Sequence, residues 1–202
     1  MSLLAAAAAL AVALATTTPV TLSVRVYDFY GLSPEHRAEA RAVAVETMKD
    51  AGVAMTWIDC RGADDQVPAT CLATLDDGEV VLRIQDRTKR VAHILGSAVV
   101  RDEGPGVLAS VYAGSVADRS AKSGVPLTTI LGRVTAHEIG HLLLGSNSHR
   151  PTGLMRASWD VRWRHPSEWR FSRDDAAAIR SRLRPGYEGD VAAFVSAAGG
   201  GR

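Results

Sequence analysis

Two histidines and a glutamate, close together in the sequence, are the residues best suited to chemistry. His137 and His141 lie four positions apart, and Glu138 stands between them. On a helix this spacing places the two imidazoles about 40° apart on one face, so both can reach one ion without distorting the backbone. Glu138 projects to the side of the pair, where it can contact a metal-bound water. The pattern is typical of zinc hydrolases, although two core histidines beside a solvated glutamate would give the same pentapeptide.

The residues that follow extend this motif. Gly145 ends the predicted helix at a residue that allows the chain to reverse direction. Another imidazole, His149, comes four positions later, and a turn over residues 151–155 carries Met155. With these additions the sequence resembles the metzincin clan of zinc peptidases. Members of that clan combine a His-Glu-x-x-His helix with a glycine turn, a third histidine and a Met-containing turn under the zinc.

The spacing to the third ligand departs from the metzincin pattern. In that family the glycine comes three positions after the second histidine and the third ligand six positions after it. Leu144 and Asn147 hold those positions here. We interpret the difference as a longer turn that delivers His149 as the third ligand. Glu168, His165 and Asn147 stay open as alternatives, and Asn147 is the weakest because a neutral amide binds zinc poorly beside imidazole or carboxylate.

The resemblance implies a zinc-dependent endopeptidase that acts on peptide or protein substrates. Three protein ligands leave one position for a water molecule whose pKa the ion lowers to about 7, and Glu138 then serves as general base. Met155 supplies an apolar floor. Residues 107–116 are predicted to form a strand that pairs with an extended substrate. Tyr112 on this strand is a candidate for binding the oxyanion, with ordinary packing as the alternative.

Two other functions use the same residues. A zinc-containing binding module that has lost turnover would keep all three ligands, although the intact Glu138 argues against it. A non-peptidase metal hydrolase would use the same scaffold on small esters or amides. We therefore carry both functions as alternatives to the peptidase.

The first fifteen residues predict export. Residues 3–15 are a nearly unbroken run of Leu, Ala and Val, too short to span a bilayer comfortably, and they end in the small-x-small pattern that suits signal peptidase. No Lys or Arg precedes the run, so an Ala-rich buried or frayed helix is the alternative. We expect residues 1–15 to be removed as a signal peptide, which makes the protein secreted or periplasmic.

The two cysteines fit that location. Cys60 and Cys71 flank a polar loop, and an even number of cysteines in an exported chain favours a disulfide. Closing a loop of this length would stabilise the fold by about 2–3 kcal/mol in the chain-entropy model. A zinc site built on these thiols would need two more ligands nearby, and the sequence offers none.

The remainder of the chain predicts one α/β domain over residues 20–185. Strands at 20–30 and 53–58 flank a helix that begins after Ser33 and ends near Gly52, which predicts a right-handed crossover and a parallel strand pair. Further elements are expected as strands at 80–85, 98–101 and 107–116 and as helices at 127–144 and from 172 to before 185.

The predicted fold class is therefore α/β, in the α+β arrangement of a zincin. We expect a mixed, mostly parallel sheet with an antiparallel edge strand, packed on two long helices and followed by a C-terminal helix. Residues 186–202 are expected to form a flexible tail.

The charge balance excludes some partners. The chain has 23 Lys and Arg against 22 Asp and Glu, a formal net charge of +1. Since there is no basic excess, nucleic acid is not an expected partner. No stretch after the leader is long and apolar enough to be a transmembrane helix. We expect a monomer that does not insert stably into a membrane.

Overall fold

The computed structural model describes residues 19–61, 67–86, 94–101, 106–160 and 165–184. The strands in this part of the chain are β1 (Val20–Asp28), β2 (Val53–Asp59), β3 (Glu79–Gln85), β4 (Gly96–Val99) and β5 (Leu108–Tyr112). The helices are α1 (Pro34–Asp50), α2 (Ala113–Ser123), α3 (Leu127–Leu144) and α4 (Arg173–Arg182). Two short 3-10 helices are η1 (Ala69–Cys71) and η2 (Pro166–Trp169).

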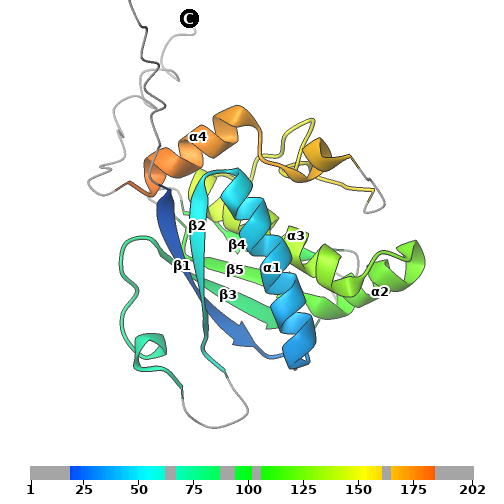
Figure 1. Cartoon of the computed structure of the whole chain (residues 1–202), viewed down its shortest axis with the longest axis horizontal. Coiled ribbons are helices and arrows are strands. Elements are labelled where there is room, and N and C mark those ends of the chain that lie inside the picture. The colour runs from blue at the N-terminus through cyan, green and yellow to red at the C-terminus, as the bar shows by residue number, and fades with distance from the viewer. Residues whose placement is uncertain (1–18, 62–66, 87–93, 102–105, 161–164, 185–202) are drawn as a thin grey trace, which may run out of the picture.

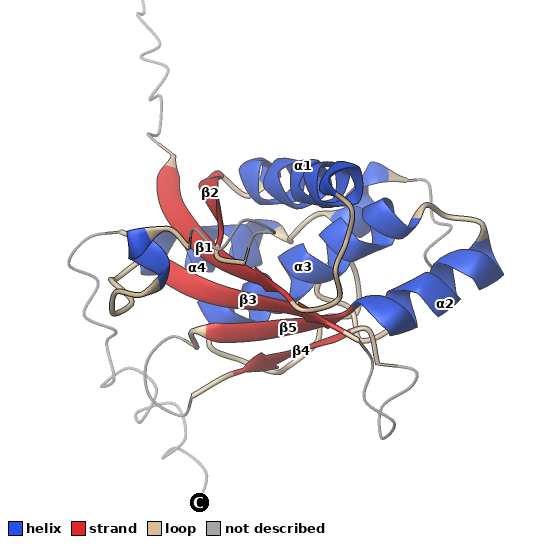
Figure 2. Cartoon of the chain, turned by 90° about the horizontal axis from the view of Figure 1, so that it is seen from below, coloured by secondary structure: helices blue, strands red, loops and turns tan. Residues whose placement is uncertain are grey.

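The strands form one sheet in the order β2-β1-β3-β5-β4. β1 pairs in parallel with β2 and β3, and β3 pairs in parallel with β5. β4 runs antiparallel to β5 at the edge. Helices α1 and α3 pack together on one face of the sheet (Figure 1 and Figure 2). The predicted fold class, a mostly parallel sheet with an antiparallel edge strand on two long helices and a C-terminal helix, is confirmed.

The core lies between this face of the sheet and the two long helices. Alternate residues of a strand point to opposite faces, and Leu22, Val24 and Val26 of β1 are buried on the helix side. Helix α3 is buried on nearly every side, because the sheet, α1 and α4 all pack against it. Its run of uncharged residues follows from that position, and α3 is the helix that carries His137 and His141.

The opposite face of the sheet is partly covered by the loop between β2 and β3. Arg25 on β1 points to this side and donates to two backbone carbonyls of the loop and to Glu79. The hydroxyl of Tyr27 donates to the carbonyl of Cys71 at 3.0 Å. Cys60 and Cys71 form the predicted disulfide, which closes the loop where it leaves β2. The disulfide fits export, and export itself stays a prediction.

One part of the predicted element order is wrong. Residues 107–116 were expected to continue as a strand, but β5 ends at Tyr112 and α2 begins at Ala113. The strand predicted at 98–101 lies slightly earlier, at Gly96–Val99. Tyr112 is the N-cap of α2 and forms no side-chain capping bond. The chain therefore enters the helix without the Ser, Thr, Asp or Asn that marks most helix starts.

The parallel pair of β1 and β2, the disulfide and the bounds of α3 agree with the sequence predictions. No helix in the described part of the chain is long and apolar enough to cross a bilayer. The predicted signal peptide at 1–15 and the predicted tail at 186–202 lie outside the described residues.

The two long helices are in tight contact at Gly132 of α3. A Cβ atom at this position would lie 2.5 Å from the carbonyl oxygen of Ala40 and 2.6 Å from the Cβ of Val43, both on α1. These atoms belong to, or are attached directly to, the backbone, so neither can move aside without shifting the helix. Glycine at this position therefore sets the distance between the helix that carries the histidines and the helix beside it.

We expect Gly132→Ala to lower the free energy of unfolding. Alanine normally stabilises a helix interior by about 1 kcal/mol relative to glycine. Here the clash with α1 should reverse that sign and cost about 1–3 kcal/mol, as overpacked cores do. Urea denaturation followed by circular dichroism measures the difference. An increase in stability would show that α1 and α3 can separate freely at this contact.

Candidate metal centre

The end of α3 sets the position of both motif histidines. Gly145 caps the helix with a φ of 62°, in the left-handed region that favours glycine, and its N–H lies within bonding distance of the carbonyls of His141 and Leu142. The chain then reverses, and Ser146 donates its N–H back to the carbonyl of His141. This turn brings the carbonyl of Ser146 within 2.7 Å of Nδ1 of His141.

Both histidines of the motif are oriented by backbone carbonyls. Nδ1 of His137 lies 2.8 Å from the carbonyl oxygen of Leu154, and Nδ1 of His141 lies 2.7 Å from that of Ser146. A carbonyl oxygen can only accept, so Nδ1 of each ring carries the proton and donates it. Burial lowers the pKa of His137 to about 3 and also lowers the pKa of His141. Both rings are therefore neutral at pH 7, and each Nε2 has a free lone pair.

These two lone pairs face each other. The Nε2 atoms of His137 and His141 lie 3.0 Å apart, and neither carries a proton to share. Two acceptors at this distance repel unless a cation lies between them. Tetrahedral zinc with Zn–N bonds of about 2.0–2.1 Å holds its nitrogen ligands about 3.3 Å apart. The arrangement therefore fits two nitrogen ligands of one zinc ion.

A third imidazole completes the set. The ring of His149 lies 5.5 Å from that of His137 and 4.9 Å from that of His141, between ring centroids. A ligand atom from each of the three histidines lies within 4.8 Å of the other two. His149 is exposed, whereas His137 and His141 are buried. Three imidazole nitrogen donors on one side of an ion suit zinc and leave a fourth position open.

Glu138 lies against the edge strand. A Cβ atom at Gly96 of β4 would come within 2.7 Å of both Cγ and Oε1 of Glu138, so the backbone of β4 passes directly over this carboxyl. Burial raises the pKa of Glu138 to about 8. A divalent cation nearby would lower that pKa again, because an opposite charge favours the carboxylate. The edge strand and the candidate general base are thus in contact.

Met155 lies beneath the helix that carries the histidines. Its side chain is 1% exposed, and its Sδ would be 2.7 Å from a Cβ atom placed on Gly140. Gly140 stands between the two motif histidines, so the methionine packs directly against the backbone of the turn that carries them. The loop turn that contains Met155 is closed by a 2.8 Å hydrogen bond from the N–H of Arg150 to the carbonyl of Met155.

A tryptophan supports His137 from the side. The indole N–H of Trp159 donates to the carbonyl of Leu154 at 3.1 Å, and this is the same oxygen that orients His137. The two rings meet edge to face with centroids 4.9 Å apart. Trp159 in turn packs on Trp169, and the guanidinium of Arg133 lies 3.7 Å from the centre of the Trp169 ring. Trp159 and Trp169 therefore pack together beside His137, and Trp163 lies outside the described residues.

The loop that carries His149 is held by a buried carboxylate. Arg150, the next residue, donates through Nε and Nη2 to Oδ1 of Asp175 at 3.0 and 2.8 Å. Asp175 lies in the first turn of α4 and is 2% exposed. Its other oxygen accepts from the hydroxyl of Ser172, the N-cap of α4. An arginine bound in this way has little freedom, so the ion pair limits the movement of the adjacent His149.

The alternative third ligands have other partners. Glu168 accepts from Arg156 at 2.6 Å, and Nδ1 of His165 lies 2.7 Å from the hydroxyl of Ser167. Neither residue belongs to the group of possible metal ligands that forms around His137 in the described part of the chain. Asn147 is exposed on the loop before His149. His149 remains our choice of third ligand.

Tyr112 is not brought into this group. It points to the same face of the sheet as Ser97, and their hydroxyls lie 3.0 Å apart. Val111 and Gly96, which pair across β5 and β4, point to the other face, toward α3 and Glu138. Tyr112 therefore lies on the opposite face of the sheet from Glu138.

The prediction that residues 107–116 pair with substrate is wrong. β5 is bonded to β3 on one side and to β4 on the other, so it has no free edge. The strand with a free side near the histidines is β4, since no other described strand pairs with it.

Sequence reasoning missed the groups that orient the ligands. The carbonyls of Ser146 and Leu154 give no sequence signal, because every residue has a carbonyl. Gly96 is the first residue of β4, but the strand was predicted only from residue 98, so the close approach of this glycine to Glu138 was missed as well. Asp175, three positions after Ser172, has the sequence signal of a helix cap alone, whereas it also binds Arg150.

The fold of this chain is similar to that of two solved structures. The chain is similar to archaemetzincin from Methanopyrus kandleri, with a TM-score of 0.48 and 16% identity over 84% of this chain and 98% of the other. It is also similar to metalloproteinase-II from Bacteroides fragilis, with a TM-score of 0.49 and 18% identity over 82% of this chain and 54% of the other. No family model and no curated protein matches.

We expect Arg150→Ala to weaken zinc binding about 10- to 100-fold, the usual cost of losing a residue that supports a ligand. The change frees the loop beside His149 but removes no ligand. Competition with a chromophoric chelator measures the affinity. Lys49→Ala is the control, because it removes an exposed ion pair with Glu46 on α1, away from the histidines. Equal affinities in the two variants would show that the Arg150–Asp175 pair does not position His149.

Proposed function

We propose that this protein is a zinc-dependent endopeptidase. The observation that carries the proposal is the convergence of three imidazoles, two of them with facing lone pairs, beside a buried glutamate. Burying an acid and neutral histidines together lowers the stability of the fold. Such groups therefore gather mainly at sites that bind a ligand or catalyse a reaction. A zinc ion held by His137, His141 and His149 would account for this arrangement.

The residues of the site then have distinct roles. When bound, zinc would supply Lewis-acid activation of water and of a substrate carbonyl. Glu138 accepts a proton at its carboxylate and passes it to the leaving amine. His137 and His141 are held in the correct tautomer by the carbonyls of Leu154 and Ser146, so they need not reorganise when the ion binds.

The position of β4 supports a peptide as substrate. An extended peptide can add to the free side of an edge strand through main-chain hydrogen bonds. Because the backbone at Gly96 passes over Glu138, a peptide bound along β4 would have its main chain beside the general base. A site of this kind would bind main chain in the interior of a polypeptide, which favours an endopeptidase over an enzyme for small esters.

His149→Ala should lower the affinity for zinc by at least about 100-fold, more than the loss of a supporting residue costs. Asn147→Ala is the matched control on the same loop and should bind within about threefold of the wild type. The zinc content of each purified variant and its affinity against a chromophoric chelator provide the measurement. A larger loss in the Asn147 variant would assign the third ligand to the position of the usual metzincin spacing.

Glu138→Gln should abolish most peptide cleavage and retain the metal. General-base catalysis contributes about 10²–10⁴-fold, so turnover of an unfolded protein substrate should fall by at least about 100-fold. Cleavage by the wild type should stop with chelator and return with zinc. Wild-type zinc binding without any cleavage would favour the silent binding module, and hydrolysis of small esters or amides alone would favour the non-peptidase hydrolase.

A further inference from the structure

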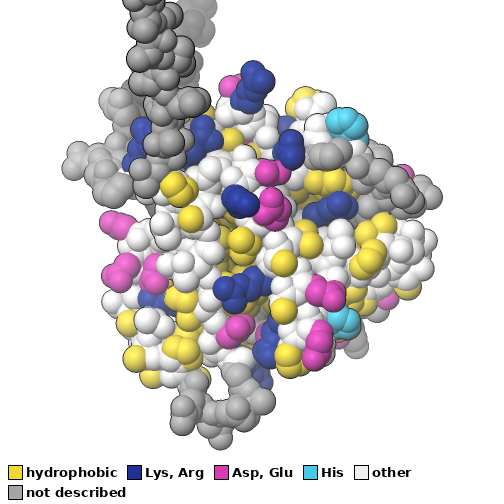
Figure 3. Space-filling model, in the orientation of Figure 1, with side chains coloured by type: hydrophobic (Ala, Val, Ile, Leu, Met, Phe, Trp, Pro, Cys, Tyr) yellow, Lys and Arg dark blue, Asp and Glu magenta, His cyan; other side chains and the backbone are white. Residues whose placement is uncertain are grey.

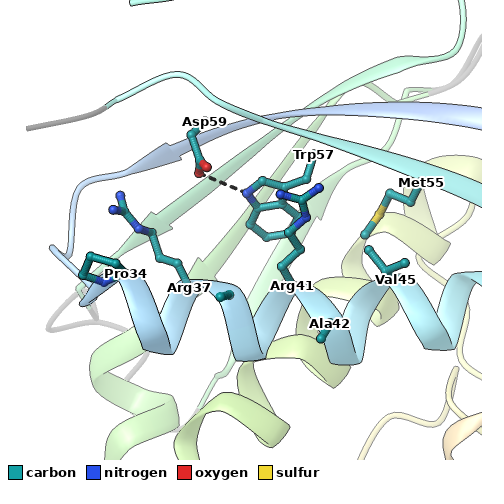
Figure 4. Close-up of a pocket in the computed structure, with 9 residues that line it drawn as sticks. Pro34, Arg37, Arg41, Ala42, Val45, Met55, Trp57 and Asp59 are labelled. Atoms are coloured by element: carbon teal, nitrogen blue, oxygen red, sulfur yellow. Dashed lines mark hydrogen bonds between the residues drawn. The ribbon is translucent and has the colours of Figure 1, made fainter. Parts of the chain in front are cut away.

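A groove separate from the histidine site runs between α1 and the edge strand β2 (Figure 4). Its volume is about 530 Å³, and no residue of the histidine cluster lines it. The apolar part of its wall comes from Val45 on α1 and from Met55 and Trp57 on β2. Met55 and Trp57 are 9% and 7% exposed, so they form a fixed surface.

Two arginines of α1 point into this groove. Arg37 is half-buried and Arg41 is exposed, and both guanidinium groups extend from the helix toward β2 (Figure 4). Neither side chain has a hydrogen bond or an ion pair with any other described residue. No acidic residue stands three or four positions from either arginine, the distances at which a helix pairs its side chains. The two like charges are four positions apart, which costs the helix stability.

The one acidic residue that lines the groove is not paired with either arginine. Asp59 accepts a hydrogen bond from the indole Nε1 of Trp57 at 3.1 Å (Figure 4). The groove thus has an apolar floor and two available cations opposite one anion. Two cations beside one anion favour an acidic ligand. This preference belongs to the groove, because the net charge of the chain is only +1 and basic and acidic side chains are interspersed over this face (Figure 3).

The strand beside the groove has a free edge. β2 is the last strand of the sheet, and no other described strand pairs on its outer side. Unpaired strand edges bind extended peptides by adding a strand to the sheet. Met55 and Trp57 point toward α1, so a peptide added to β2 would direct every second side chain toward the arginines.

The spacing of the arginines fits such a peptide. Four residues along α1 correspond to about 6 Å. Side chains on the same side of an added strand recur every two residues, or about 6.6–6.8 Å. We propose that the groove binds an extended segment of another protein whose acidic side chains are two positions apart, with its main chain paired to β2. This site does not depend on the proposed peptidase activity.

A labelled peptide tests this site. The probe is a fluorescein-tagged peptide of nine Ser, Thr and Val residues with Glu at positions 4 and 6, and its twin has Gln at both. Anisotropy with the full chain, in chelator so that nothing is cut, should show at least about tenfold tighter binding of the Glu peptide, from two charge-assisted contacts. A Glu peptide N-methylated on alternate residues should bind as weakly as the Gln twin, because it cannot pair with β2.

Charge variants identify the surface. Arg37→Gln combined with Arg41→Gln should weaken the Glu peptide at least about tenfold and leave the Gln peptide unchanged. Lys122→Gln combined with Arg173→Gln is the control, since it changes the net charge equally at exposed positions elsewhere. The control should stay within about twofold of the wild type.

Three results would overturn the proposal. Equal binding of the Glu and Gln peptides would show that the acidic side chains do not contribute to binding. An equal loss in the control variant would show that only the net charge of the protein matters. The third concerns residues 185–202, which contain Glu188 and Asp190 two positions apart. If a chain that ends at Arg184 binds the probe tenfold more tightly, the groove belongs to this segment of the same chain.

Discussion

The facing Nε2 lone pairs of His137 and His141 determine what the surrounding structure must provide. Each ring presents its lone pair only because a carbonyl holds the proton on Nδ1. One carbonyl belongs to the loop after α3 and the other to the turn that contains Met155. The site therefore requires the helix end at Gly145 and the later turn to be in place together. Trp159 reinforces this by donating to the same carbonyl of Leu154.

The local parts of this arrangement could be predicted from the sequence. The spacing of the histidines, the glycine at the helix end and the bounds of α3 all depend on neighbouring residues. The end of β5 could not be predicted in this way. Val111, Tyr112 and Val116 suit a strand, but α2 begins at Ala113 without a side-chain cap. Helix α2 packs against α3, and a contact between distant segments leaves no local signal in the sequence.

The departure from the metzincin spacing has a similar explanation. A loop that is two residues longer needs its own restraint if it is to hold a ligand. The ion pair between Arg150 and Asp175 provides one, and its partners are 25 positions apart. Each residue has an ordinary local interpretation, a loop arginine and a helix-capping acid. Only the fold shows that they meet, so the sequence alone left the third ligand open among several residues.

The site also explains why α3 is apolar on almost every side. Burying Glu138 raises its pKa to about 8, and burying two neutral imidazoles removes them from water, so both changes oppose folding. A helix surrounded by sheet, α1 and α4 buries enough apolar surface to offset that cost. The tight contact at Gly132 adds to this packing five residues before the first ligand, His137. The stability of the core and the chemistry of the site are carried by the same helix.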